Sequence, residues 1–190
     1  RVMGNNPSRF QGEPKRPVEH VSWDEAVEFC RRLSELPGEK LARRQYALPT
    51  EAQWEYACRA GNPGRWWFST QPNPVPVDAE KEFVIPCAWI GANSGGQTHP
   101  VGQMRANAWG LHDVYGNVWE WCQDRYDGGY YATSPTDNPT GPQGGSHHVI
   151  RGGCCNDLAM GCRSAHRAGN SPESRNGEIG FRVALLQPDK

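Results

Sequence analysis

The sequence predicts one loop-rich α+β domain over residues 1–190, with two helices and several short strands. Two segments begin with a helix-capping pattern, and the other apolar runs are too short for helices but long enough for strands. The 22 glycines and 16 prolines exceed the usual share of these residues, which predicts much irregular backbone. The eight tryptophans predict that aromatic rings fill much of the core.

Both predicted helices begin with a capping box, in which an N-cap Ser or Thr and a Glu or Gln three residues later satisfy each other's free amides. The first box runs from Ser22 to Glu25, and its helix is predicted to end before residues 37–38 (Pro-Gly). The second box runs from Thr50 to Gln53, and its helix is predicted to end at Gly61.

Strands are predicted only in short pieces. Residues 62–148 have no helical period, and the apolar runs 83–85 and 118–121 are the candidates there. Strand character returns at 148–150 and 181–185, and the residues between these two runs include almost no large apolar side chain. Loops of such length in a compact domain are usually functional or held by specific contacts.

Charge, hydropathy and cysteine spacing exclude several classes of protein. The net charge of -1 predicts no nucleic-acid partner and no anionic membrane surface. No apolar stretch approaches the length of a membrane span. The seven cysteines include no Cys-x-x-Cys pair, which argues against a zinc ribbon and leaves the redox compartment open.

Seven blocks occur in the order 17–23 (PVEHVSW), 48–57 (LPTEAQWEYA), 99–102 (HPVG), 109–113 (WGLHD), 116–121 (GNVWEW), 151–153 (RGG) and 180–182 (GFR). Together they resemble the formylglycine-generating enzyme (sulfatase-modifying factor) family. The resemblance implies a C-type-lectin-like fold with two helices and small twisted sheets. Residues 3–4 resemble an early Met-Gly of the family, so the first strands of the family would precede Arg1.

Residues 151–183 resemble a second pattern more closely. Arg-Gly-Gly at 151–153, Ala159, Cys-Arg-Ser-Ala at 162–165, and Ile-Gly-Phe-Arg-Val at 179–183 form a framework. This framework is similar to the variable region of diversity-generating retroelement target proteins, in which template adenines are mutagenised and diversified positions alternate with fixed ones. The resemblance is compatible with surface display or association with a prophage, and the compartment stays open.

The positions between the framework residues are the predicted ligand-binding residues. They are Cys155, Asn156, Asp157, Leu158, Met160, Gly161, His166, Ala168, Gly169, Asn170, Ser171, Ser174, Asn176, Gly177 and Glu178. All except Met160 and Glu178 are residues that a mutagenised Asn codon can encode. The alternative is a relative of the enzyme that has simply diverged.

The copper site of the enzyme family is not predicted here. The resemblance implies two cysteines five residues apart after Arg-Gly-Gly, and the second matches Cys162 while the first falls on Asp157. A carboxylate is a hard ligand that suits Cu(I) poorly, and Cys154 and Cys155 have the wrong spacing to replace the missing thiol. We expect Cys162 to be a small buried residue; the alternative is a copper oxidase that acts through Cys162.

The resemblance also implies a structural Ca²⁺ ion near residues 113–120. Its ligands would be the side chains of Asp113 and Glu120 and the backbone carbonyls of Gly116 and Val118, which are the oxygen ligands that Ca²⁺ prefers. The alternative is that the two carboxylates only cap or pair with local groups. A second calcium site of the family lacks its Asp after Asn93.

The framework arginines 163, 167, 175 and 182 allow two interpretations. They could form an anion site, or they could hydrogen-bond the backbone of the long loops, which is the interpretation we favour because Arg has five donors. The tryptophans of the family blocks, at 23, 54, 109, 119 and 121, are predicted to be core, and Trp66-Trp67 to be core or a ligand platform.

These observations predict a binding module. The framework would hold residues 154–178 as a rigid patch, and the side chains between framework residues would contact a protein ligand, with modest affinity because many of them are small. A catalytically inactive structural relative remains a third interpretation.

Overall fold

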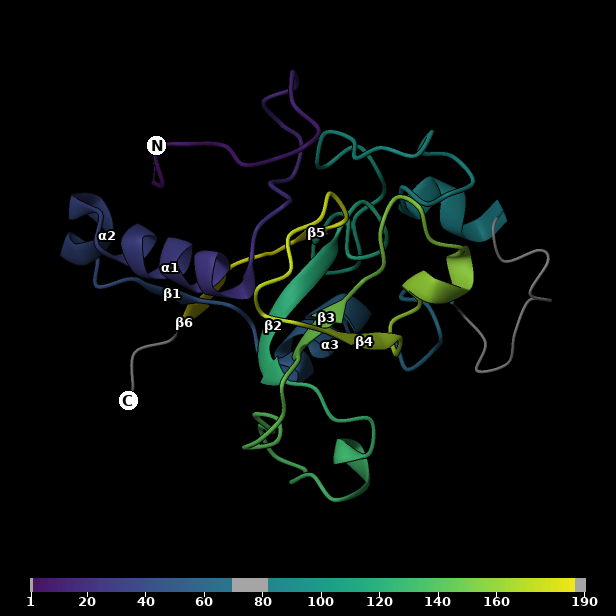
Figure 1. Cartoon of the computed structure of the whole chain (residues 1–190). Helices are drawn as coiled ribbons and strands as arrows, with labels where there is room; N and C mark the ends of the chain where they lie inside the picture. The colour runs from purple at the N-terminus through teal and green to yellow at the C-terminus, as the bar shows by residue number, and fades with distance from the viewer. Residues whose placement is uncertain (1, 70–81, 187–190) are drawn as a thin grey trace.

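The computed structural model describes residues 2–69 and 82–186 (Figure 1). The helices are α1 (Trp23–Ser34), α2 (Pro37–Leu41) and α3 (Glu51–Arg59), and 3-10 turns lie at Ile85–Cys87 (η1), Tyr130–Ala132 (η2) and Ala159–Cys162 (η3). The strands are β1 (Gln45–Ala47), β2 (Trp119–Arg125), β3 (His148–Arg151), β4 (Arg167–Asn170), β5 (Ile179–Gly180) and β6 (Ala184–Leu186). Long irregular segments join these short elements, as the composition predicted.

Both predicted capping boxes are present. The Ser22 hydroxyl accepts a hydrogen bond from the Glu25 amide while the Glu25 side chain accepts one from the Ser22 amide, and Thr50 and Gln53 do the same for α3. Helix α3 ends at Ala60, whose φ of +48° turns the chain out of the helix. Helix α2, with Pro37 in its first turn, was not predicted because it is only five residues long.

The central sheet has the strand order β4-β3-β2-β5. Strands β2, β3 and β4 pair antiparallel, whereas β5 pairs parallel to β2 with Ile179 opposite Trp119. Helix α1 packs on the face that includes Trp121 and Ile150, and α3 packs on the opposite face. A separate two-stranded sheet pairs β1 with β6 beside α1 (Figure 1).

Two strand predictions are wrong in part. Residues 82–84 are helical and continue into η1, because Pro86 has no amide for a strand ladder. In the predicted strand 181–185 only the last two residues are extended in β6. The other two predicted strands correspond to β2 and β3, and β2 continues to Arg125.

The tryptophan predictions are correct except at one position. Trp54, Trp119 and Trp121 are buried and Trp23 is half-buried, but Trp109 is 48% exposed and stacks edge-on against exposed Tyr56. Trp66 is buried, so it belongs to the core rather than to a ligand platform. None of the helices in the described ranges is long and apolar enough to cross a membrane.

Candidate functional site

Residues 151–183 leave the central sheet at the end of β3 and return to it through η3, β4 and β5 (Figure 1). The turn after β3 depends on Gly152 and Gly153, whose φ angles are +94° and +76°. A Cβ atom at Gly153 would lie 2.4 Å from Sγ of Cys162. Only glycine fits at this point, and it brings η3 directly against the end of β3.

Most of the predicted ligand-binding residues reach the surface. Asn156 and Leu158 are exposed, while Cys155 and Gly177 are buried and present no side chain to solvent. The partly exposed ones are Asp157, Met160, Gly161, His166, Ala168, Gly169, Asn170, Ser171, Ser174, Asn176 and Glu178. The exposed and partly exposed residues together are called the variable face below.

One part of the variable face surrounds buried Trp119. The His166 ring lies 5.6 Å from the Trp119 ring, and Ala168 packs against the same core cluster. The side-chain amide of Asn156 donates to the Glu178 carboxylate at 2.7 Å. The backbone carbonyl of Glu178 accepts from the backbone amide of Trp119. Trp119 therefore contacts His166 through its ring and Glu178 through its backbone amide.

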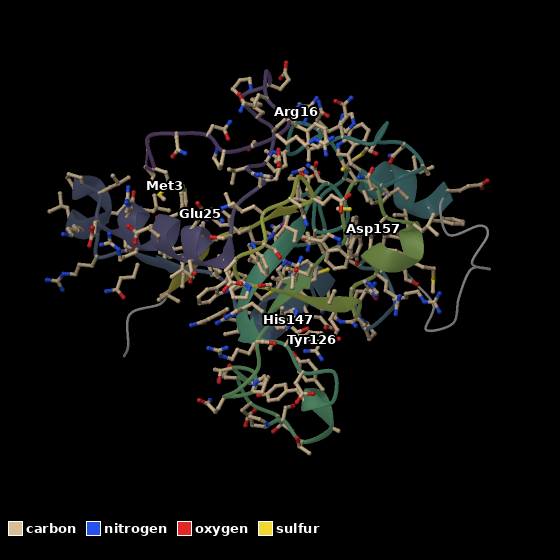
Figure 2. All side chains as sticks on the ribbon, in the orientation of Figure 1. Met3, Arg16, Glu25, Tyr126, His147 and Asp157 are labelled. Carbon is tan, nitrogen blue, oxygen red and sulfur yellow. The ribbon has the colours of Figure 1, made fainter. Side chains whose placement is uncertain are left out.

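Another part of the variable face is apolar. Leu158 is 80% exposed, and Met160 lies two residues further on, with its sulfur 3.7 Å from the Arg65 guanidinium. Asp157 (labelled in Figure 2) lies between Asn156 and Leu158, and its carboxylate accepts a hydrogen bond from the Cys154 amide. The turn is also fixed by a bond from the Gly91 amide to the Asp157 carbonyl.

The loop that closes the variable face is held by backbone hydrogen bonds. The Pro172 carbonyl accepts from the amide of Trp23 at the start of α1, and the Asn176 carbonyl accepts from the His20 amide. Within the loop, the Ser174 hydroxyl donates to the Asn170 side chain. These contacts fix the backbone while leaving the side chains of Ser171 and Ser174 partly exposed.

The framework arginines hold the backbone of the loops, as predicted. The guanidinium of each donates to a backbone carbonyl: Arg163 to Met160, Arg167 to Asp127, Arg175 to Glu173, and Arg182 to His112 and Asp113. Three of them also pair with a carboxylate outside the variable region: Arg167 with Glu51, Arg175 with Glu25, and Arg182 with Glu120. These pairings leave little support for an anion site.

A buried charge network lies beneath β4. Arg151 is fully buried and pairs with Glu51 and Glu55, and Arg167 binds both oxygens of Glu51 at 2.8 and 2.7 Å. The Asp124 carboxylate accepts from the Glu51 amide, and burial raises the pKa of Asp124 to about 6. Because Arg59 also pairs with Glu55, three carboxylates meet three guanidinium groups. The contacts of Arg151 and Arg167 anchor β3 and β4 to α3.

The cysteines near the position of the family's copper site, Cys154, Cys155 and Cys162, all lie in the protein interior. Cys162 is fully buried, and burial raises the pKa of its thiol above the usual range. Cys154 and Cys155 are also buried. In the ranges 2–69 and 82–186, no group of three or more His, Cys, Asp or Glu side chains is placed to hold a metal ion.

The proposed calcium ligands include free oxygen atoms. Oδ2 of Asp113 accepts from the Gly102 amide, while the buried Oδ1 has no hydrogen-bond partner among the described residues. Glu120 accepts from the Trp54 indole at 2.6 Å and binds Arg182 through both oxygens. Burial raises the pKa of Asp113, an effect that a bound cation would offset. The free Oδ1 of Asp113 is the kind of oxygen ligand that Ca²⁺ prefers, whereas Glu120 already has a cationic partner in Arg182.

Sequence reasoning missed the partners of the framework arginines. Glu25 and Glu51 lie in the first turns of α1 and α3, where acidic residues are common for local reasons. No spacing rule connects them to Arg175 and Arg167, which are more than a hundred residues away in the sequence. The exposed aromatic pair of Tyr56 and Trp109 was also missed.

Comparison with known proteins relates this geometry to a family. The model of the sulfatase-modifying factor enzyme 1-like domain matches residues 1–186. A formylglycine-generating enzyme of Streptomyces coelicolor is 37% identical over 183 residues, which cover 93% of this chain and 55% of that protein. The chain spans about half the length of the curated relatives it matches.

Two solved structures share the fold. Treponema denticola variable protein 1 superposes with a TM-score of 0.79 and 31% identity, covering 98% of this chain and 79% of that one. PvdO from Pseudomonas aeruginosa superposes with a TM-score of 0.77 and 28% identity, covering 94% of this chain and 65% of that one. The predicted C-type-lectin-like fold is confirmed.

Proposed function

The chain belongs to the sulfatase-modifying factor enzyme family, and from this premise we propose that it is a ligand-binding protein rather than an oxidase. The variable face would be a diversified site for a protein ligand, displayed on a C-type-lectin-like scaffold. The similarity to a variable protein of Treponema denticola supports the scaffold. The diversified site itself is the proposal.

The observation that carries the proposal is a division of roles within residues 151–183. The framework residues Arg151, Gly153 and Cys162 are buried, and a Cβ atom at Gly153 would overlap Cys162. The residues between them are mostly exposed or partly exposed, and few of them contact the core. If the residues between the framework positions change while the framework stays fixed, the protein can bind a different ligand without a change of fold.

The mechanism is that of a pre-organised binding surface. The hydrogen bonds and ion pairs of the framework arginines, together with the backbone hydrogen bonds of the loops, fix the surface before a ligand arrives. Little conformational entropy is therefore lost on binding. The polar part around Trp119 supplies adaptable hydrogen bonds, and Leu158 and Met160 supply apolar contact. We expect modest affinity for this variant, because it has no exposed aromatic anchor on the variable face.

A display experiment tests the proposal. One yeast-displayed library randomises Asn156, Leu158, Met160, Gly161, His166 and Ser174, and a matched library randomises six surface positions of α1 and α2: Glu28, Arg31, Arg32, Glu35, Glu39 and Leu41. Both are selected against hen egg-white lysozyme. We expect both libraries to display folded protein and only the first to yield binders. Equal yields from the two libraries, or failure of the first to display, would contradict the proposal.

A copper oxidase acting through Cys162 is the second candidate, supported by the similarity to formylglycine-generating enzymes. Incubation of the protein with Cu(I), oxygen and a cysteine-containing sulfatase peptide tests it by mass spectrometry. We expect the peptide cysteine to remain unconverted, because position 157 is Asp and Cys162 is buried. Formation of formylglycine that a Cys162→Ser variant abolishes would establish the oxidase instead.

A further inference from the structure

A buried carboxylate lies beneath the last turn of residues 151–183. Glu19 is fully buried, and its Oε1 accepts a hydrogen bond from the Phe10 amide at 2.8 Å. Its other oxygen, Oε2, is buried without a hydrogen-bond partner among the described residues. Buried charged groups in proteins are normally paired or fully hydrogen-bonded. The free Oε2 therefore points to a donor that the present side chains do not supply.

The residue opposite this free oxygen is Gly177. A Cβ atom at Gly177 would lie 3.4 Å from Oε2 of Glu19, and 3.1 and 3.5 Å from Cδ and Cβ of Arg9. Arg9 is exposed and its guanidinium lies over the Phe10 ring, so its chain is able to move aside. The φ of Gly177 lies outside the left-handed region, so a residue with a side chain fits the backbone at this position.

The backbone around Gly177 is held against the segment that contains Glu19. The amide of His20 donates to the carbonyl of Asn176 at 3.0 Å. Glu19 forms an antiparallel β-bridge with Gly180. Gly177 lies between these two contacts in the sequence, so the free carboxylate oxygen and the place of the missing Cβ are both fixed before a side chain is introduced.

We propose that Glu19 is a fixed positioning residue of the diversified site and anchors the side chain at position 177. The inference rests on the proposed function, because it takes position 177 to be one of the diversified positions. A hydroxyl or amide group attached to the Cβ comes within hydrogen-bond reach of Oε2, and a hydrogen bond to a carboxylate is stronger than one between neutral groups. An anchored side chain has one direction at the surface, so less rotamer entropy is lost when a ligand binds it. The glycine of the present sequence leaves the anchor unused.

Substitutions at position 177 of the unbound, whole chain test this anchor. Asn and Asp have nearly the same shape, but only Asn has a donor, whereas the carboxylate of Asp repels Glu19. We expect Gly177→Asn to melt at least about 3 °C above Gly177→Asp at pH 7. Gly177→Ser and Gly177→Ala form a second matched pair, in which the Ser variant should melt at the higher temperature because its hydroxyl donates to Oε2.

The matched change at the anchor is Glu19→Gln. The glutamine oxygen accepts from the Phe10 amide as Oε1 does, while its NH₂ group takes the place of Oε2. The free acceptor thereby becomes a donor, so the advantage of Asn over Asp at position 177 should disappear in the Glu19→Gln background. A purely structural role of Glu19 would lower both melting temperatures equally and leave their difference unchanged.

The melting temperatures decide for or against the anchor. An advantage of Asn that disappears with Glu19→Gln supports the proposal. An advantage that Glu19→Gln leaves unchanged, or equal melting of the Ser and Ala variants, would overturn it. If Gly177→Asp does not fold, recovery of its folding by Glu19→Gln supports the proposal and lack of recovery overturns it.

These melts need no ligand, so their outcome is separate from that of the display selection. Binders from the display library together with an unchanged Asn advantage would overturn the anchor and leave the diversified site standing. An anchor confirmed by the melts, together with a library that yields no binders, would contradict the proposed function instead.

Discussion

The glycines between residues 153 and 177 differ in the room that their neighbours leave for a side chain. A Cβ atom at Gly161 meets only Asp157, at 3.5 Å, whereas one at Gly169 would lie 2.5 Å from the Tyr126 ring. Although Gly161 and Gly169 are both predicted ligand-binding positions, a side chain at Gly169 would have to displace Tyr126. At Gly177 a Cβ would lie 3.1 Å from Arg9, which is tight but adjustable.

This difference predicts the effects of three substitutions on thermal unfolding. We expect Gly161→Ser to leave the melting temperature unchanged, because its Cβ has ordinary contacts. Gly169→Ser must displace Tyr126 and should lower stability by about 1 to 3 kcal/mol. Gly153→Ser should prevent folding, because its Cβ would overlap Cys162 at a positive φ. Equal melting temperatures for Gly161→Ser and Gly169→Ser would show that the packing around Tyr126 is not as described.

The buried, unpaired Oδ1 of Asp113 predicts that calcium stabilises the protein. A ligand that binds only the folded state raises its melting temperature. We expect 2 mM CaCl₂ to raise the melting temperature by several degrees relative to EGTA, and Asp113→Asn to remove most of the difference. Asn tolerates the φ of +54° at this position, which makes it a suitable replacement. A melting temperature that is the same in CaCl₂ and EGTA would exclude the ion.

At the scale of elements, the central sheet is tied to α3 by the ion pair of Arg167 with Glu51. Glu51 is 1% exposed and Arg167 17% exposed, so the pair is largely removed from solvent. Removing one partner of a buried pair costs about 3 to 5 kcal/mol because the other charge is left without compensation. We expect Arg167→Met to lower the free energy of unfolding by about 3 kcal/mol, measured by urea denaturation.

A matched control is Arg31→Met. Arg31 is 55% exposed and pairs with Glu28 on the surface of α1, so its loss should cost less than about 1 kcal/mol. If both variants lose the same stability, then β4 is not anchored through Glu51. Hydrogen exchange of the β4 amides gives a second readout, since these should exchange faster in Arg167→Met alone.

The buried carboxyl group of Asp124 makes the stability of this network depend on pH. Burial raises the pKa of Asp124 from its usual 3.8 to about 6 in the folded protein. The folded state therefore binds the proton more tightly, and this stabilisation is complete below pH 4 and is lost as the pH rises through 6. The shift corresponds to about 3 kcal/mol.

Asp124→Asn should mimic the protonated carboxyl group. We expect this variant to be more stable than the unmodified protein at pH 7.5 and to lose most of this advantage at pH 4.5, in denaturation experiments at the two pH values. If the unmodified protein and the variant gain the same stability between pH 7.5 and pH 4.5, the pH dependence comes from a group other than Asp124.

At the scale of the whole molecule, patterns of adjacent residues predicted the helices better than they predicted the contacts between segments that are distant in the sequence. The capping boxes at Ser22 and Thr50 identified α1 and α3, because a cap is a property of adjacent residues. The strand at 83–85 was predicted wrongly, because an apolar run does not distinguish a strand from a helical turn. Exposure between 151 and 183 follows the predicted division only in part, since Cys155 and Gly177 are buried whereas the framework residues Ala165 and Arg175 are exposed.

Contacts between distant segments were not predictable. The burial of Cys155 and Gly177 follows from how η3 and the last loop pack on the rest of the chain, and nothing adjacent in the sequence indicates it. Long-range packing decided these features.

The central claim is that residues 151–183 are a diversified site on a fixed scaffold, and sequencing of the DNA that flanks the gene tests it most directly. The account predicts a near-repeat of the codons for these residues that differs at adenines, beside a reverse transcriptase gene. The differences should fall in codons of the variable face, such as those of Asn156, Leu158 and His166, and should spare those of Arg151, Gly153 and Cys162. Flanking DNA without such a repeat, or a repeat whose differences fall equally on the framework codons, would contradict the claim.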